Sequence, residues 1–263
     1  MKICMIGDSH LAMMINAQRQ DPIDGLDITP VSWPRQWFDQ VAFEGTEICA
    51  NGAELAEDWD RCGLPARLDL STFDKVVFVS YTITAFHAFV ILGDHAVSGW
   101  NDASFLVKKL NSQLKGPGKR RLITPAVFRE SLAGLIRENH TFGFVDHLRQ
   151  HCDVPIVVIP APYLAEHTLD HRKNLWGLKQ VLRKRDGAVM VDALHDAHQM
   201  VFGAYSNLTL LRQPEESVVR GCLTSDVYRA GATRMGTGAL HREDDILHAG
   251  PKLGRLYLQK ISA

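Results

Sequence analysis

The sequence predicts an α/β protein in which a mostly parallel sheet is wound between helices. Short Val- and Ile-rich runs of strand length recur along the chain, and stretches with helical periodicity separate most of them. Such runs are typical of strands buried on both faces of a parallel sheet, and the intervening helices supply the crossover connections that parallel strands require. The chain has 263 residues and 46% hydrophobic content, so we expect one large core and one domain over residues 1–263.

The expected strands are continuous apolar runs, the second being the weakest. In chain order they are Ile3–Ile6, Thr46–Cys49, Val76–Ser80, Pro155–Ile159 and Ala188–Val191. The expected helices are Leu11–Gln20, Ser104–Leu114, Thr124–Glu138, His171–Arg185 and Gly250–Ile261, the last of which is clearly amphipathic. The stretch near 204–244 is rich in glycine and lacks strong periodicity, so we expect an irregular excursion there, a kind of segment that is often functional.

Composition excludes several classes of function. Lys and Arg total 29 against 30 for Asp and Glu, so no net field would recruit nucleic acid or an anionic membrane. The five cysteines are far apart and form no CxxC pair, which predicts reduced thiols and no metal site. The first apolar run passes straight into a polar turn, unlike a secretory signal, and no run approaches the roughly 20 residues that span a bilayer. We therefore expect a cytoplasmic protein that needs no cofactor.

The tripeptide Gly7-Asp8-Ser9 directly follows the first expected strand. In an open parallel sheet, ligands bind beyond the carboxyl ends of the strands, so Ser9 lies where a nucleophile would be useful. The alternative is that Asp8 or Ser9 only caps the next helix. A serine nucleophile also needs a histidine to remove its proton and a third group to orient that histidine. His10 is adjacent but is expected to point away along the helix.

The residues for such a partnership occur near the other end of the chain. Asp245 and His248 stand three apart in a predicted loop just before the last helix. At this spacing a carboxylate can lie beside one ring nitrogen while the other nitrogen faces a nucleophile. The sequence therefore offers an acid and a base together.

With Gly7-Asp8-Ser9 after the first strand and Asp245-x-x-His248 before the C-terminal helix, the chain resembles the SGNH (GDSL-type) hydrolases. The resemblance implies a three-layer α/β/α sandwich with a mostly parallel, flavodoxin-like sheet. It also implies that Ser9 is the nucleophile, that Asp245 and His248 complete a catalytic triad, and that the substrates are acyl or acetyl esters.

The resemblance further implies three donors in an oxyanion hole: the Ser9 amide, a glycine amide after the second strand, and an asparagine after the third. Gly52, in Asn51-Gly52-Ala53, matches the second, although a glycine needed only for a turn is an equal alternative. No asparagine follows the third strand, where the residues are Ser80-Tyr81-Thr82-Ile83-Thr84. Asn101, in Gly99-Trp100-Asn101-Asp102, would serve if its loop folds back, and a helix cap is the alternative. Tyr81, Thr82 or Thr84 are other candidate donors.

These residues favour a serine esterase that acts on a small-molecule or carbohydrate ester. An acyltransferase on the same scaffold, or a non-catalytic binding protein with an incomplete oxyanion hole, are the alternatives. His87, His95 and His241 are pocket candidates that more often turn out to be ordinary surface or core histidines. Arg229 and Arg234, in the irregular stretch, are candidates for holding an anionic substrate, although most loop arginines are simply solvated.

Overall fold

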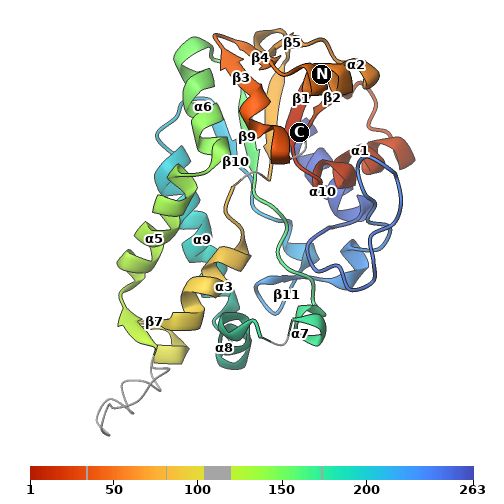
Figure 1. Ribbon diagram of the computed structural model, residues 1–263. Helices are drawn as coiled ribbons and strands as arrows, with labels where there is room; N and C mark the ends of the chain where they lie inside the picture. Colours follow the sequence, from red (N-terminus) through yellow and green to blue (C-terminus); the bar gives the residue numbers. More distant parts are fainter. Residues whose placement is uncertain (34, 81, 104–119, 173) are drawn as a thin grey trace, which may run out of the picture.

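The computed structural model describes residues 1–33, 35–80, 82–103, 120–172 and 174–263. Within this part of the chain, five strands form the central sheet (Figure 1), in the order β10-β9-β6-β1-β2. They are β1 (Lys2–Gly7), β2 (Asp27–Val31), β6 (Lys75–Val79), β9 (Ile156–Ile159) and β10 (Leu208–Leu210), and every neighbouring pair is parallel. This is the winding of flavodoxin-like sheets, so the expected sheet is confirmed.

Helices cover both faces of the sheet. Neighbouring residues of a strand point to opposite faces, so β1 supplies both cores: Ile3 and Met5 on one side, Cys4 and Ile6 on the other. The first core is completed by α1 (Leu11–Gln20) and α10 (Pro251–Ser262). The second is completed by α2 (Ala53–Arg61), α3 (Ala85–Asp94), α5 (Pro125–Arg137), α6 (His140–His151), α8 (Trp176–Lys184) and α9 (Gly187–Phe202). The fold is therefore a three-layer α/β/α sandwich, as expected.

Smaller elements surround this sandwich. An antiparallel sheet consists of β3 (Val41–Glu44), β4 (Glu47–Ala50) and β5 (Arg67–Asp69). Two further pairs are β7 (His95–Val97) with β8 (Arg121–Ile123) and β11 (Val218–Val219) with β12 (Leu223–Thr224). The short helix α7 (Thr168–His171) precedes α8, and 3-10 turns occur at Arg35–Gln40, Leu70–Thr72, Glu215–Ser217 and Asp226–Tyr228.

Two strand predictions were wrong: one predicted strand belongs to a different sheet, and one predicted strand is part of a helix. The run Thr46–Cys49 does form a strand, β4, but in the small antiparallel sheet rather than the central one. The second strand of the central sheet is β2, whose Pro30 is tolerated because β2 is an edge strand. Ala188–Val191 lies inside helix α9, because a short apolar run does not by itself distinguish a strand from a buried helix.

Three of the predicted helices match helices of the structure, whereas the predicted irregular excursion contains a strand of the central sheet. Leu11–Gln20, Thr124–Glu138 and Gly250–Ile261 match α1, α5 and α10 closely. The expected helix His171–Arg185 is shorter and begins at Trp176, while Ser104–Leu114 falls outside the described residues. The excursion near 204–244 is mostly irregular but contributes β10 to the central sheet.

Candidate active site

Ser9 lies in the turn between β1 and α1, at the carboxyl edge of the central sheet. Gly7 ends β1 beside Val79 of β6, and a Cβ atom on Gly7 would lie 2.5 Å from the Val79 carbonyl oxygen. Only glycine allows this close approach of the two strands. The backbone N–H of Leu11 donates to the Asp8 carbonyl at 3.0 Å, which turns the chain into α1. The N-cap position of α1 is His10, so the Ser9 hydroxyl does not cap the helix.

The structure brings Ser9, His248 and Asp245 into one hydrogen-bonded chain. The Ser9 Oγ lies 2.7 Å from His248 Nε2, and His248 Nδ1 lies 2.8 Å from Asp245 Oδ2. A carboxylate at Nδ1 selects the tautomer that carries its proton there and leaves Nε2 to accept from the serine hydroxyl. This is the arrangement needed to remove a proton from Ser9.

Backbone groups hold the Asp245 carboxylate in place. Its Oδ1 accepts hydrogen bonds from the backbone N–H groups of Leu247 at 2.8 Å and His248 at 2.9 Å. These bonds form because Asp245-x-x-His248 folds back on itself just before α10 begins at Pro251. The three-residue spacing therefore allows the acid to be held beside the base by bonds within one turn of the chain.

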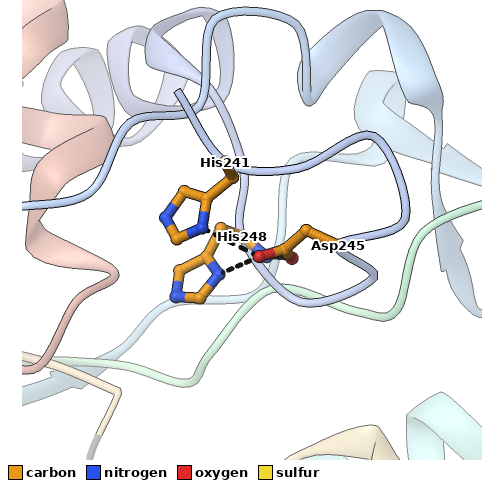
Figure 2. A group of neighbouring side chains, drawn as sticks. All are labelled: His241, Asp245 and His248. Carbon is orange, nitrogen blue, oxygen red and sulfur yellow. Dashed lines mark hydrogen bonds and ion pairs between the residues drawn. The ribbon is translucent and has the colours of Figure 1, made fainter. Parts of the chain in front are cut away.

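Two further histidines pack on the faces of the His248 ring. The His241 ring stacks on it with centroids 3.8 Å apart, and the His10 ring lies 4.9 Å away at a small interplanar angle of 26°. Figure 2 shows that His241 and His248 both direct Nδ1 at the same Asp245 oxygen; the His241 distance is 2.9 Å. The expectation that His10 points away along α1 was wrong, because the turn at Ser9 directs its ring back toward the site. His10 was not predicted as a site residue, whereas His241 was named only as a pocket candidate, and its spacing four residues before Asp245 is the signal that could have placed it beside the acid.

Arg229 stabilises the loop that contains Asp245 and His248 by hydrogen bonds to its backbone carbonyl groups. Its Nε donates to the His248 carbonyl at 3.0 Å, and its Nη2 donates to the Asp245 carbonyl and lies 3.4 Å from Asp245 Oδ1. Its Nη1 lies 2.8 Å from Nε2 of His167. The Arg229 side chain is only 10% exposed, so it serves the architecture of the site and is not open to an anionic substrate.

The electrostatics favour an ionised acid beside a neutral base. Burial alone would raise the pKa of Asp245, but hydrogen bonds from the backbone of His248 and Leu247 and from the His248 ring hold this pKa well below its usual range. Burial lowers the pKa of His248, and the charge of His10 lowers it further, against the raising effect of Asp245. His248 is therefore kept neutral, the form that accepts a proton.

Gly52 lies after β4 at the N-cap of α2, so its amide is at the positive end of a helix. A Cβ atom at this position would lie 2.1 Å from the Gln40 Oε1 atom, so the Gln40 side chain packs closely over the glycine. The backbone N–H of Asn51 donates to the Gln40 carbonyl at 2.8 Å and fixes the approach to α2. The role of Gly52 as an oxyanion donor stays a prediction.

Asn101 lies elsewhere in the fold. It follows β7, which α3 separates from the carboxyl end of β6 (Figure 1); ten helical residues span about 15 Å. Its side-chain amide donates to the Lys184 carbonyl at 3.1 Å, at the end of α8, and its backbone N–H donates to Asp186. These contacts favour a structural role, and the structure does not bring Asn101 to Ser9.

Thr82 and Thr84, two other candidate oxyanion donors after β6, form hydrogen bonds with other residues of the fold. The Thr82 hydroxyl lies 3.1 Å from His198 Nε2, and Thr84 caps α3 by accepting from the Phe86 N–H at 3.2 Å. Tyr81 lies outside the described residues. Ser80 has a left-handed φ of 64°, and its hydroxyl donates to Asp8 Oδ2 at 2.9 Å, which ties the end of β6 to the Ser9 turn. Among these side chains, Ser80 is therefore the one joined to the Ser9 turn.

The two stacked histidines and Asp245 also have the donor types of a metal site. Their ligand atoms lie within 4.8 Å of one another. His248 Nδ1 is hydrogen-bonded to the carboxylate, His241 Nδ1 lies at ion-pair distance from the same oxygen, and the Arg229 guanidinium lies beside the carboxylate. The acid–base role proposed for this cluster below rests on the contact between Ser9 and His248.

Comparisons with known proteins give a similarity to a solved structure but none in sequence. No family model matches the chain, and no curated protein is similar to it in sequence. Among solved structures, the chain is similar to a protein named as a GDSL-like lipase from Bacteroides ovatus, with 15% sequence identity and a TM-score of 0.32. The match covers 86% of this chain and 48% of that protein, so the chain spans about half of its length. A TM-score this low transfers no activity, and function is argued from the side chains.

No helix among the described residues is long and apolar enough to cross a membrane.

Proposed function

We propose that the protein is a serine ester hydrolase of the SGNH type. The observation that carries the proposal is the continuous chain from Ser9 Oγ through the His248 ring to the Asp245 carboxylate, with both contacts under 3 Å. Nucleophile, base and orienting acid are the three parts that acyl transfer through serine requires. We expect acyl or acetyl esters as substrates, esters of carbohydrates among them.

In the first half of the reaction, the Ser9 oxygen attacks the ester carbonyl while its proton passes to His248 Nε2. The imidazolium that forms is stabilised by Asp245, which stays ionised. His248 then gives the proton to the alcohol oxygen as the carbon–oxygen bond breaks, leaving the acyl group on Ser9. In the second half, water attacks this acyl group, passing a proton to His248, and the acid leaves as Ser9 recovers its proton.

The negative charge that develops on the carbonyl oxygen needs hydrogen-bond donors. The Ser9 amide and the Gly52 amide are the proposed donors, and the positive end of α2 would add to the field at Gly52. Two backbone donors without a third from a side chain would give a slower enzyme, since one donor contributes about 10²–10³-fold in rate.

Hydrolysis of p-nitrophenyl acetate and of an acetylated sugar by the purified protein tests the proposal. We expect acetate and alcohol to be released in equal amounts by the wild-type protein and by neither Ser9→Ala nor His248→Ala. Asp244→Asn is the matched control, because Asp244 is exposed and pairs with Arg242 rather than with a site residue. Equal rates for wild type and Ser9→Ala would contradict the proposal, and acetate found on an added sugar acceptor would show a transferase.

A further inference from the structure

A groove of about 470 Å³ opens between α1, α2 and the segment 233–240. This segment folds back on itself through the antiparallel bridge between Thr233 and Leu240. The Asn16 side chain of α1 donates to the Thr233 hydroxyl at 2.6 Å and holds the segment against the helix. The volume is in the range of small-molecule sites, which is about 300–1,000 Å³.

Two arginines line the groove from different walls, Arg19 from α1 and Arg234 from the folded segment. Both are exposed, and within the described part of the chain neither pairs with a carboxylate. The carboxylate of the groove, Asp58, pairs instead with Arg61 at 2.8 Å. Two unpaired guanidinium groups around one cavity favour an anion, because their planar donors match the oxygens of a carboxylate or phosphate.

The rest of the lining adds apolar surface next to these charges. Ile15, Pro30 and Met235 contribute side chains to the same groove. A ligand with an anionic group on a small carbon skeleton would satisfy both parts of this lining. An inorganic ion alone would leave the apolar part uncovered.

The groove lies beside the candidate active site. Ala12, in its wall, is in the first turn after Ser9, and Ser32 follows the end of β2, the strand next to β1. The other wall, the folded segment, leads directly into His241, which stacks on His248. Burial lowers the pKa of His241, and the charges of His248 and, to a smaller extent, Arg234 lower it further, against the raising effect of Asp245. The walls of the groove are therefore continuous in the chain with Ser9 and with His241, while the side chains of the hydrogen-bonded chain itself are not part of its lining.

We propose that this groove binds the anionic end of an ester substrate, a carboxylate or phosphate on a small organic group, between Arg19 and Arg234. The assignment of the ligand as a substrate rests on the esterase function proposed above, whereas anion binding does not. Binding is therefore measured with Ser9→Ala, which cannot turn the ester over, and hydrolysis is measured separately with the wild type.

The test uses 4-acetoxybenzoate and its methyl ester, which differ only in the charge at one end. Calorimetry with Ser9→Ala is expected to show about four- to 25-fold tighter binding of the anion, since each of the two exposed ion pairs contributes about two- to fivefold. Adding Arg19→Gln or Arg234→Gln should reduce the preference several-fold, and 1 M salt should reduce it in the same way. Arg121→Gln, a change of an exposed arginine at β8 outside the groove, should leave it unchanged.

Equal binding of the two esters, binding of neither, or a preference that survives both groove substitutions would overturn the proposal. Arg234 lies outside any helix, so its variant remains informative if Arg19→Gln weakens the end of α1. If the anion binds as expected but wild type hydrolyses neither ester, the groove proposal stands and the esterase proposal fails. If wild type hydrolyses both at equal kcat/KM and binds them equally, only the groove proposal fails.

Discussion

The side chains of Ser9, His248 and Asp245 join in a continuous network, whereas the polar side chains that follow β6 mostly bond elsewhere in the fold. The first region, here the acid–base half, contains Ser9, His248 and Asp245, with Arg229 behind the loop. The second, here called the oxyanion half after its proposed role, contains the Gly52 amide and the segment after β6, in which Thr82 and Thr84 bond to His198 and to the start of α3.

The difference shows which part of the proposed active site is set by local sequence. Asp245 and His248 are placed by a four-residue turn that closes with its own backbone hydrogen bonds. Oxyanion donors come from separate segments and must converge through the packing of α2 and the end of β6. A complete acid–base half beside a reduced oxyanion half predicts a functional but slow enzyme.

The largest effect is expected from Ser9→Ala and His248→Ala, each of which should lower kcat for a short-chain ester by about 10⁴-fold or more. A nucleophile and its base act as a unit, so the double variant should be little worse than either single one. Steady-state kinetics with thermal unfolding as a folding control measures this. Additive losses would show that the two residues do not act together.

Asp245→Asn should cost somewhat less than loss of the serine, about 10³–10⁴-fold in kcat, because the base remains but its tautomer and orientation are less well held. The same assay on Asp244→Asn provides the comparison, since Asp244 is exposed and should leave kcat unchanged. Greater damage from Asp244→Asn would mean that the wrong acid has been assigned.

The Gly52 amide is tested by two variants in a Gln40→Ala background, which removes the side chain that a Cβ atom would strike. Gly52→Ala keeps the N–H, whereas Gly52→Pro deletes it. The proline variant should be slower by about 10²–10³-fold at similar KM, because the donor acts chiefly in the transition state. Equal kcat for the two variants would remove Gly52 from the oxyanion hole.

A smaller effect concerns pH. Because the pKa of His248 is lowered, the acid limb of kcat/KM should fall below the ordinary histidine value of about 6.5. His10→Phe keeps a ring on His248 but removes the charge that lowers this pKa, so the pKa should rise and the limb should move to higher pH. A limb that stays in place or moves to lower pH would show that His10 does not act on His248.

The smallest effect on turnover is expected from Asn101→Ala. Loss of its hydrogen bond to the Lys184 carbonyl should cost about 0.5–2 kcal/mol of stability and leave kcat nearly unchanged. Denaturant unfolding and kinetics on the same variant measure both quantities. A 100-fold loss of kcat with unchanged stability would show instead that Asn101 is an oxyanion donor.

The sequence predicted the acid–base half better than the outer parts of the fold. Gly7, Ser9 and the Asp245-x-x-His248 turn depend on residues close together in the chain, so their pattern is visible without tertiary structure. The edge strand β2 was missed because its Pro30 and polar residues do not match the continuous apolar pattern of a buried strand. The helix at 187–202 was taken for a strand, since its first apolar residues resemble one.

Contacts between distant segments account for what the sequence did not show at the site. His10 and His241 stack on His248 from opposite ends of the chain, and no local pattern indicates the stacking itself. The role of Arg229 depends on carbonyl groups 16 and 19 residues away. Whether residues 1–263 form a single domain stays a prediction.

Reaction with a fluorophosphonate probe, followed by mapping of the labelled peptide by mass spectrometry, tests the central claim most directly. It requires an activated serine but no knowledge of the substrate. The wild-type protein should be labelled at Ser9, His248→Ala should be labelled at least about 100-fold more slowly, and Asn101→Ala should be labelled at the wild-type rate. No labelling of the folded wild-type protein, or labelling that persists unchanged in His248→Ala, would contradict the account of Ser9 as a nucleophile activated by His248.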